Sequence, residues 1–428
     1  MDLKPHSVVL GMAGALMSFA IVAGAQTTST PPPPPTAPDS TPAAAAAAPA
    51  PVWSAGTIDF SGYVDGYFTY NHDRPAGNTN YNYNFNDQDQ FNLEAAKVTL
   101  NHDPDPVGAH VDLIFGRTNA LLHPNGNGGS SDGAGVNYIE QAYLSVKPPK
   151  AKGFELDFGQ FVTSAGQEVI ETMNNWSYSH GLLFTDAIPY YHFGIRTSMP
   201  LTKTWTAGVQ VVNGWNNVTD NNGGVTIGLT SSLVKPKYTW NTNYYVGPEN
   251  SGITPPSYAG TQKGYRNLID TTLLLTPTAK FNMYVNYDYV QNHTPAVPAC
   301  GPCESAAVKA TSRHVQGVAV SARGQISANG ALVGRYEYLA DEGPTGIIYG
   351  NAYAPIGTGT KQKLDEFTGT YEYKWPAGLL LRAEYRIDWS DHKVFSYGND
   401  LSISPYTPTK TSQQTLTVGM IAFFGPKR

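Results

Sequence analysis

The sequence predicts an all-β protein: a transmembrane, antiparallel, up-and-down β-barrel of about 16 strands, with short periplasmic turns and long extracellular loops. The first observation is strict alternation, as in LRAEYRIDW at residues 381–389, where apolar and charged residues take turns. Alternate residues of a β-strand point to opposite faces. A membrane barrel sets the apolar face against lipid and the charged face in a wet interior, whereas a soluble sandwich sets its polar face in bulk water.

Composition is the second observation. Charged residues make up 14% of the 428 residues, below the roughly 25% of soluble domains. Aromatic residues at 12%, with 27 Tyr and 43 Gly, favour many short strands joined by polar loops. No apolar run of the mature region reaches about 18 residues, which excludes a helical membrane protein. The net charge of -6 argues against a nucleic-acid partner, because phosphate binding requires a basic surface.

The third observation is that short and long connections alternate in strict order along the chain. The short ones contain the Pro, Gly, Asn and Asp of tight turns, and they lie at 103–106, 148–153, 201–203, 235–237, 276–279, 327–330 and 376–378. The long ones run to roughly 11 to 28 residues in this reading of the strands. A soluble sandwich has no reason to keep its short turns at one end, whereas outer-membrane barrels do.

The strands follow from the alternation and the turns. We expect them near residues 58–70, 90–102, 107–117, 137–147, 154–162, 191–200, 204–213, 225–235, 237–247, 265–276, 280–290, 313–326, 331–340, 361–374, 379–389 and 413–424. Most are long enough to cross a bilayer at the tilt that barrels adopt. If a weak strand such as 225–235 is miscounted, fourteen or eighteen strands are the alternatives.

The N-terminal region predicts export. Lys4 and His6 precede an apolar segment, and Ala23, Gly24 and Ala25 form a cleavage-site pattern, so we expect a signal peptide at 1–25 rather than a membrane anchor. The Pro/Ala-rich residues at 26–55 cannot bury a core and are expected to form an extended periplasmic tether. The barrel domain is expected at 56–428, located in the outer membrane and in contact with its lipid.

Three motifs resemble those of the outer-membrane β-barrel porins called OmpL-like porins. They are GYVDGYF at 62–68, LDFGQFVTSAGQEVIE at 156–171 and YYHFGIR at 190–196, and the similarity in pattern extends over nearly all of residues 56–428. The resemblance implies a porin-like channel, for which the partners are small hydrophilic solutes and ions. It supplies no site residues and no cofactor, and whether the barrel is a monomer or a homotrimer stays open.

The connection at 163–190 is the longest and is the predicted constriction of the channel. Sixteen strands enclose more space than side chains alone fill, so the lumen is either aqueous or plugged. This loop combines Glu168, Glu171 and Asp186 with apolar residues that include Trp176 and Phe184. Folded into the barrel, the apolar residues would pack on the wall and hold the carboxylates at a narrow point. The alternative is an external loop packed on its neighbours or on another subunit.

Strand phase predicts which charges line the pore. The pore-lining candidates are Arg196, Lys280, Arg335, Glu337, Arg382, Glu384, Arg386 and Asp388. The wider inward set contains six basic and twelve acidic residues, which predicts a mild preference for cations, because charge in a narrow pore selects ions. The alternative is that these charges pair across strands and leave little net field.

The remaining motifs point away from catalysis. The only cysteines, Cys300 and Cys303, form a CGPC sequence without the strand-to-helix context of a redox pair, so we expect a small loop disulfide. The ten His residues show no metal-binding pair such as H-E-x-x-H, and we expect no metal, no cofactor and no enzyme activity. The rival function is a non-conducting outer-membrane barrel that acts as an adhesin or a structural protein.

Overall fold

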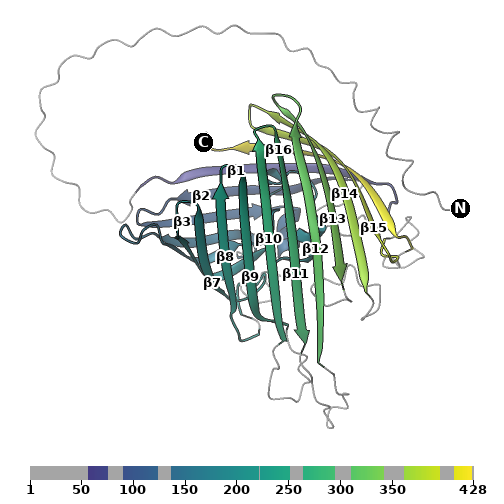
Figure 1. Cartoon of the computed structure of the whole chain (residues 1–428). Coiled ribbons are helices and arrows are strands. Elements are labelled where there is room, and N and C mark those ends of the chain that lie inside the picture. The colour runs from purple at the N-terminus through teal and green to yellow at the C-terminus, as the bar shows by residue number, and fades with distance from the viewer. Residues whose placement is uncertain are drawn as a thin grey trace, which may run out of the picture. The chain divides into compact units, whose positions relative to one another are not determined.

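The computed structural model describes residues 56–75, 90–123, 136–220, 222–250, 264–294, 310–341, 361–395 and 409–426. In these residues sixteen antiparallel strands form one closed barrel in which each strand pairs with its neighbours in sequence and β1 pairs with β16 (Figure 1). The predicted fold class and the count of sixteen are confirmed. No helix in the described part of the chain is long and apolar enough to cross a membrane.

The strands agree with the alternation pattern within a few residues at each end. They are β1 (Asp59–Asn71), β2 (Gln90–His102), β3 (Val107–Phe115), β4 (Ile139–Val146), β5 (Glu155–Val162), β6 (Tyr191–Pro200), β7 (Trp205–Val212), β8 (Thr226–Lys235), β9 (Tyr238–Asn250), β10 (Gly264–Thr278), β11 (Phe281–Thr294), β12 (Thr311–Gln325), β13 (Gly330–Asp341), β14 (Gln362–Trp375), β15 (Leu379–Ser390) and β16 (Ser412–Phe424). The short helices are α1 (Arg117–Leu122), η2 (Val136–Tyr138), η3 (Thr172–Asn174) and α2 (Leu182–Asp186).

Seven short connections lie at one end of the barrel, which we call the short-turn end. They join β2 to β3, β4 to β5, β6 to β7, β8 to β9, β10 to β11, β12 to β13 and β14 to β15. Because all strands are antiparallel, the longer connections leave from the opposite end, which we call the long-loop end. Tight turns need residues such as Pro104, Pro236 and Gly378, and the φ of +91° at Gly378 is one that L side chains rarely adopt.

The two faces of the wall differ in the way the alternation predicts. On β1, Val64 is 47% exposed on the outer face, whereas its neighbour Asp65 is fully buried on the inner face. On β15, Arg382, Glu384, Arg386 and Asp388 are all buried inside the barrel. The outer face therefore suits lipid, and the charges gather in the lumen.

Two of the register shifts between paired strands change this phase inside the lumen. The pairing of β1 with β2 shifts between Asp65 and Gly66, which leaves Glu94 as the extra residue, and the pairing of β3 with β4 shifts after Asp112, which leaves Glu140 extra. A bulge places two residues of one strand opposite one of its partner and so changes which side chains point inward. Both glutamates are buried in the barrel.

Candidate functional site: the lumen and its inserted loop

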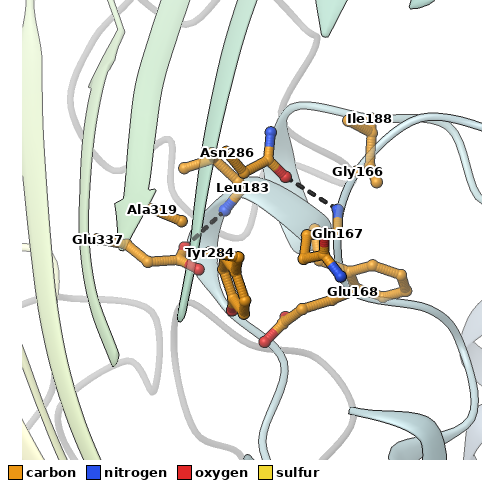
Figure 2. Close-up of a pocket in the computed structure, with 10 residues that line it drawn as sticks. Gly166, Gln167, Glu168, Leu183, Ile188, Tyr284, Asn286, Ala319 and Glu337 are labelled. Atoms are coloured by element: carbon orange, nitrogen blue, oxygen red, sulfur yellow. Dashed lines mark hydrogen bonds between the residues drawn. The ribbon is translucent and has the colours of Figure 1, made fainter. Parts of the chain in front are cut away.

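The loop at 163–190 lies inside the barrel. It leaves β5 and returns to β6, yet its backbone is bonded to the inner faces of strands on the other side of the lumen. The amide of Asn243 on β9 donates to the Ser164 carbonyl at 2.8 Å, and the Gln167 N–H donates to Asn286 of β11 at 2.9 Å (Figure 2). The loop therefore crosses the lumen rather than packing outside it.

Three arginines of β13 and β15 bind the loop through its backbone carbonyls. Arg335 donates to the Ser179 carbonyl at 2.8 Å, and Arg386 donates to the His180 carbonyl at 2.5 Å. Arg382 makes the largest number of these bonds: its guanidinium donates to the carbonyls of Thr172 at 2.5 Å, Ser177 at 3.1 Å and Asn175. A guanidinium has five N–H donors in a fixed fork, so one side chain can hold several turns of a loop.

Carboxylates of the same wall bind the N–H groups of the loop. Glu384 accepts hydrogen bonds from the backbone N–H of Tyr178 at 2.6 Å and of Ser179 at 3.0 Å. Glu337 accepts one from the Leu183 N–H at 2.9 Å, as Figure 2 shows. The wall thus supplies donors for the loop carbonyls and acceptors for its N–H groups, which is what a backbone buried away from water requires.

The Tyr178 side chain connects the loop to β1 and β16 of the wall. Its hydroxyl donates to Asp65 of β1 at 2.8 Å, and its ring lies against Gly419 of β16. A Cβ at Gly419 would come within 2.2 Å of the ring, so this position accepts the loop only because it has no side chain.

Two of the three predicted loop carboxylates are paired with basic side chains of the wall. Glu168 forms an ion pair with Arg335 and accepts the Gly181 N–H at 2.7 Å. Glu171 lies 2.5 Å from the Lys97 ammonium of β2. The structure therefore places both side chains at anchoring contacts of the loop.

Asp186 has a different environment. It lies at the end of α2 and is buried, and neither carboxylate oxygen has a hydrogen-bond partner among the described residues. Burial raises the pKa of Asp186 well above its usual value, and the nearby carboxylates of Asp341, Glu337 and Asp388 raise it further, while Arg386 opposes them. The buried site therefore disfavours the charged form of Asp186.

Lys97 is the centre of an ionic cluster that the sequence did not indicate. Its ammonium lies 2.8 Å from Asp112, 2.6 Å from Glu140 and 2.5 Å from Glu171. The three carboxylates lie within 4.8 Å of one another, a spacing that could hold a metal ion, but the lysine already supplies the positive charge there. The bulges at Glu94 and Glu140 explain why a regular alternation did not assign Lys97 and Glu140 to the lumen.

Apolar side chains fill the lumen towards the long-loop end. Leu182, Leu183 and Phe184 of α2 belong to one buried cluster with inward residues of β10 to β14, namely Leu268, Val290, Val315, Leu339 and Leu364. A cavity of about 10 Å³, roughly the space for one water, lies between the loop and the wall of β11, β12 and β13 (Figure 2). The loop lies tightly against this part of the wall.

Arg196 of β6 lies nearer the short-turn end, where the lumen keeps contact with solvent. The Arg196 side chain is 25% exposed, is paired with Asp157 at 2.7 Å and stacks over the rings of Tyr143 and Phe161. Asp388 lies towards the long-loop end of β15, where it is buried and paired with Arg386 at 2.7 Å. Lys280 was predicted to line the pore, but it lies in the turn after β10 and is exposed. Cys300 and Cys303 lie outside the described residues.

The chain belongs to the family described as beta-barrel porin-2, OmpL-like, whose model matches residues 57–424. A search of curated proteins finds no match. Solved structures share the fold at low identity. A loop-deletion mutant of OmpT, an outer-membrane protein of Vibrio cholerae, has a TM-score of 0.54 at 14% identity and covers 87% of this chain and 100% of its own.

Two further structures are similar. The outer-membrane channel DcaP of Acinetobacter baumannii has a TM-score of 0.53 at 13% identity, and the match covers 86% of this chain and 97% of that one. An anion-selective porin of Comamonas acidovorans has a TM-score of 0.52 at 11% identity, covering 86% and 99%. Family and fold together define an outer-membrane porin-like barrel.

Proposed function

We propose that the barrel is a channel for passive diffusion of small hydrophilic solutes and ions across the outer membrane, and that the loop at 163–190 sets its narrowest point. The observation that carries this proposal is the loop itself, which is bonded across the lumen of a closed sixteen-strand barrel. A wall of sixteen strands is wide enough for an aqueous passage, and the partly exposed Arg196 supports water in the lumen. The loop then determines how much of that width is open.

The proposed selectivity is a mild preference for cations. Inward carboxylates outnumber inward basic residues, and charge lining a narrow pore determines which ions enter. The pairing of Glu168 with Arg335 and of Glu171 with Lys97 reduces their fields, so the preference is expected to be small. Fold alone does not decide the sign, since one structure of this fold is described as an anion-selective porin.

A second candidate is a non-conducting barrel with an adhesive or structural role. The tight apolar packing of Leu182, Leu183 and Phe184 against the wall is the observation that favours it. In this reading the loop is a permanent plug and the barrel passes nothing.

Single-channel recording in a planar bilayer separates the two functions. We expect the full-length protein to conduct, and deletion of residues 170–184 to raise its conductance severalfold because the chain that crosses the lumen is removed. No current from the full-length protein, whether or not the deletion variant conducts, would support the non-conducting barrel. Equal conductance of the two would show that the loop does not set the narrowest point.

Ion selectivity is tested by the reversal potential in a salt gradient. Neutralising Glu168 and Glu171 to Gln is expected to move it towards anions, with Lys150→Gln at an exposed short turn as the matched control outside the lumen. An anion-selective wild type would instead show that the arginines of β6, β13 and β15 set the field.

The proposed processing of the N-terminus has its own test. Mature protein from outer-membrane fractions should begin at or near Gln26, with the tether at 26–55 in the periplasm. N-terminal sequencing that finds Lys4 retained would contradict this.

A further inference from the structure

A groove of about 400 Å³ lies on the outer face of the barrel, across β7, β8 and β9 near the short-turn end. Its two sides are the indole rings of Trp205 and Trp240, which are 42% and 51% exposed. Between them lie Leu233 and a row of small polar residues, Ser231 on β8 and its partner Thr242 on β9. The volume falls within the range of pockets that bind small molecules. These strands stand side by side in Figure 1.

The indole N–H groups are turned towards the wall. Trp205 donates to the Ser231 hydroxyl at 2.9 Å, and Trp240 donates to the Thr271 hydroxyl of β10 at 2.9 Å. A tryptophan N–H needs a hydrogen-bond partner where water is scarce. Both rings are therefore satisfied without water, which leaves their apolar faces and edges available to a hydrocarbon ligand.

One end of the groove carries an ammonium group. Lys235 donates to the Thr204 hydroxyl at 3.1 Å, and Thr204 is part of the lining. Lys203 and Lys237 stand in the adjoining turns and are exposed. The segments 197–219 and 223–248, which contain these strands and turns, hold the three lysines and no Asp or Glu. This rim is therefore positively charged with no acidic residue in either segment to neutralise it.

We propose that this groove binds an anionic phospholipid of the periplasmic leaflet. In this proposal the lipid phosphate forms an ion pair with Lys235, and its acyl chain lies between Trp205 and Trp240. The short-turn end of an outer-membrane barrel faces the periplasm, so the lysines lie at the depth of the phosphates of that leaflet. A juxtamembrane lysine attracts an anionic lipid, and the groove adds contact with the acyl chain. An aromatic belt alone lacks both the hollow and the one-sided charge.

Native mass spectrometry of the full-length protein in detergent tests the proposal. Phosphatidylglycerol and phosphatidylcholine with identical acyl chains are added together. We expect one phosphatidylglycerol to be retained at least about tenfold better than phosphatidylcholine, which corresponds to about 1.4 kcal/mol. Lys235→Glu should reduce this ratio to about one, whereas Lys150→Glu, at the exposed turn between β4 and β5, should leave it unchanged. Equal retention of the two lipids by the wild type would overturn the site.

A second variant tests the groove separately from the charge. Ser231→Phe fills the hollow between the two indoles and keeps Lys235, so retention of phosphatidylglycerol should fall as it does in Lys235→Glu. Retention unchanged by Ser231→Phe would overturn the groove as the chain site. A loss in Lys150→Glu equal to that in Lys235→Glu would show general attraction by lysines and overturn it too.

Fluorescence gives an independent readout in bilayers. Brominated phosphatidylglycerol should quench tryptophan emission more than brominated phosphatidylcholine, and Lys235→Glu should remove the difference. Each variant must first run as a folded, heat-modifiable barrel on a gel. A purified oligomer that buries Trp205 and Trp240 and retains no lipid would assign the groove to a contact between copies of the chain and overturn the proposal.

Discussion

Two neighbouring stretches of the loop at 163–190 are held in the lumen by different forces. Residues 168–180 are held by charged side chains of the wall, with Arg335, Arg382 and Glu384 bonded to the loop backbone. Residues 182–188 are held mainly by apolar packing against β10 to β14, with one wall carboxylate, Glu337, bonded to the Leu183 N–H. We call them the polar anchor and the apolar anchor.

The difference between the anchors indicates how each part of the loop should respond to mutations and to solution conditions. Apolar packing is non-directional and responds little to pH. Buried charges are strong only while every partner is present, because a charge left alone in the interior is costly. The polar anchor should therefore be the more sensitive to single substitutions, and the apolar anchor the more tolerant of changing conditions except at Asp186, the one ionisable side chain within it.

The largest expected effect comes from breaking the polar anchor at Arg382. Arg382→Met leaves the carbonyls of Thr172, Asn175 and Ser177 without their donor. Removing one member of a buried ionic network costs about 3–5 kcal/mol, and each 1.4 kcal/mol is tenfold in an equilibrium constant. We expect hydrogen exchange of the Tyr178 and Ser179 N–H groups to accelerate at least about a hundredfold, since their protection depends on docking.

Arg323 offers a matched control for this experiment. Its guanidinium lies 2.7 Å from Glu372, the same carboxylate that pairs with Arg382 at 2.8 Å, but no hydrogen bond or ion pair of Arg323 with the described loop is found. Arg323→Met should leave exchange in the loop near the wild-type rate. Equal acceleration in both variants would show that the effect passes through Glu372 and not through the loop carbonyls.

The apolar anchor should give a smaller change. Leu182 is fully buried in the cluster that α2 forms with the wall, and a Leu→Ala substitution in such a site costs about 2–5 kcal/mol. Part of this cost should be relieved, because the loop can settle into the space. We expect Leu182→Ala to raise the rate of proteolytic cleavage within 170–190 about tenfold, as followed by mass spectrometry of the fragments.

A leucine on the lipid face serves as the control for Leu182. Leu229 of β8 is 49% exposed on the outer face, so Leu229→Ala removes the same atoms without touching the loop. Its cleavage pattern should match that of the wild type. If Leu182→Ala also matches the wild type, the apolar anchor contributes little to docking.

The next effect concerns pH and Asp186. Docking of the loop raises the pKa of Asp186, so the docked state favours the neutral carboxyl. The stabilisation of the docked loop by this neutral carboxyl is complete below a pH of about 3.9, the ordinary pKa of an aspartate. That stabilisation falls as pH rises from there towards the raised pKa, by up to about 1.4 kcal/mol per unit. Glu337 and Asp341 of β13 and Asp388 of β15 oppose the charge, and Arg386 of β15 favours it.

Asp186→Asn removes this titration and leaves the other groups in place. Loop hydrogen exchange compared between variant and wild type at pH 5, 6, 7 and 8 should show a difference that grows with pH, with the variant the better protected. Burial lowers the pKa of His180, but His180 is present in both proteins and its effect cancels from the comparison. A difference that is constant with pH would mean that Asp186 is ionised in the docked loop.

Much of this architecture could be predicted from the sequence. The strand predicted at 90–102 has those bounds in the structure, and the weak strand predicted at 225–235 is β8 at Thr226–Lys235. Period-two alternation and turn residues are local signals, so they predict strands and turns without knowledge of tertiary contacts. The apolar residues of 163–190 were the signal for a loop folded into the barrel, and Leu182 and Phe184 lie in the buried cluster with inward residues of the wall.

The partners of the charges could not be predicted. Lys97 and Glu140 lie on strands whose phase is altered by bulges, and a bulge has no sequence pattern that a count of alternation detects. The pairing of Glu171 with Lys97 depends on where the loop crosses the lumen. The strand prediction extended to Lys280, which stands at a turn, because strand ends are the least certain part of such a pattern.

The smallest effect is expected outside both anchors, at an exposed ion pair. Lys147 lies 3.1 Å from Glu155 near the short-turn end, and the two side chains are 46% and 30% exposed. Water and salt screen such a pair, and pairs of this kind contribute about 0–1 kcal/mol. Lys147→Ala should therefore change neither loop exchange nor the reversal potential measurably, whereas Lys97→Ala, which removes a buried ammonium shared by three carboxylates, should change both. A shift from Lys147→Ala as large as that from Lys97→Ala would mean that net lumen charge, rather than burial of the pair, controls the loop.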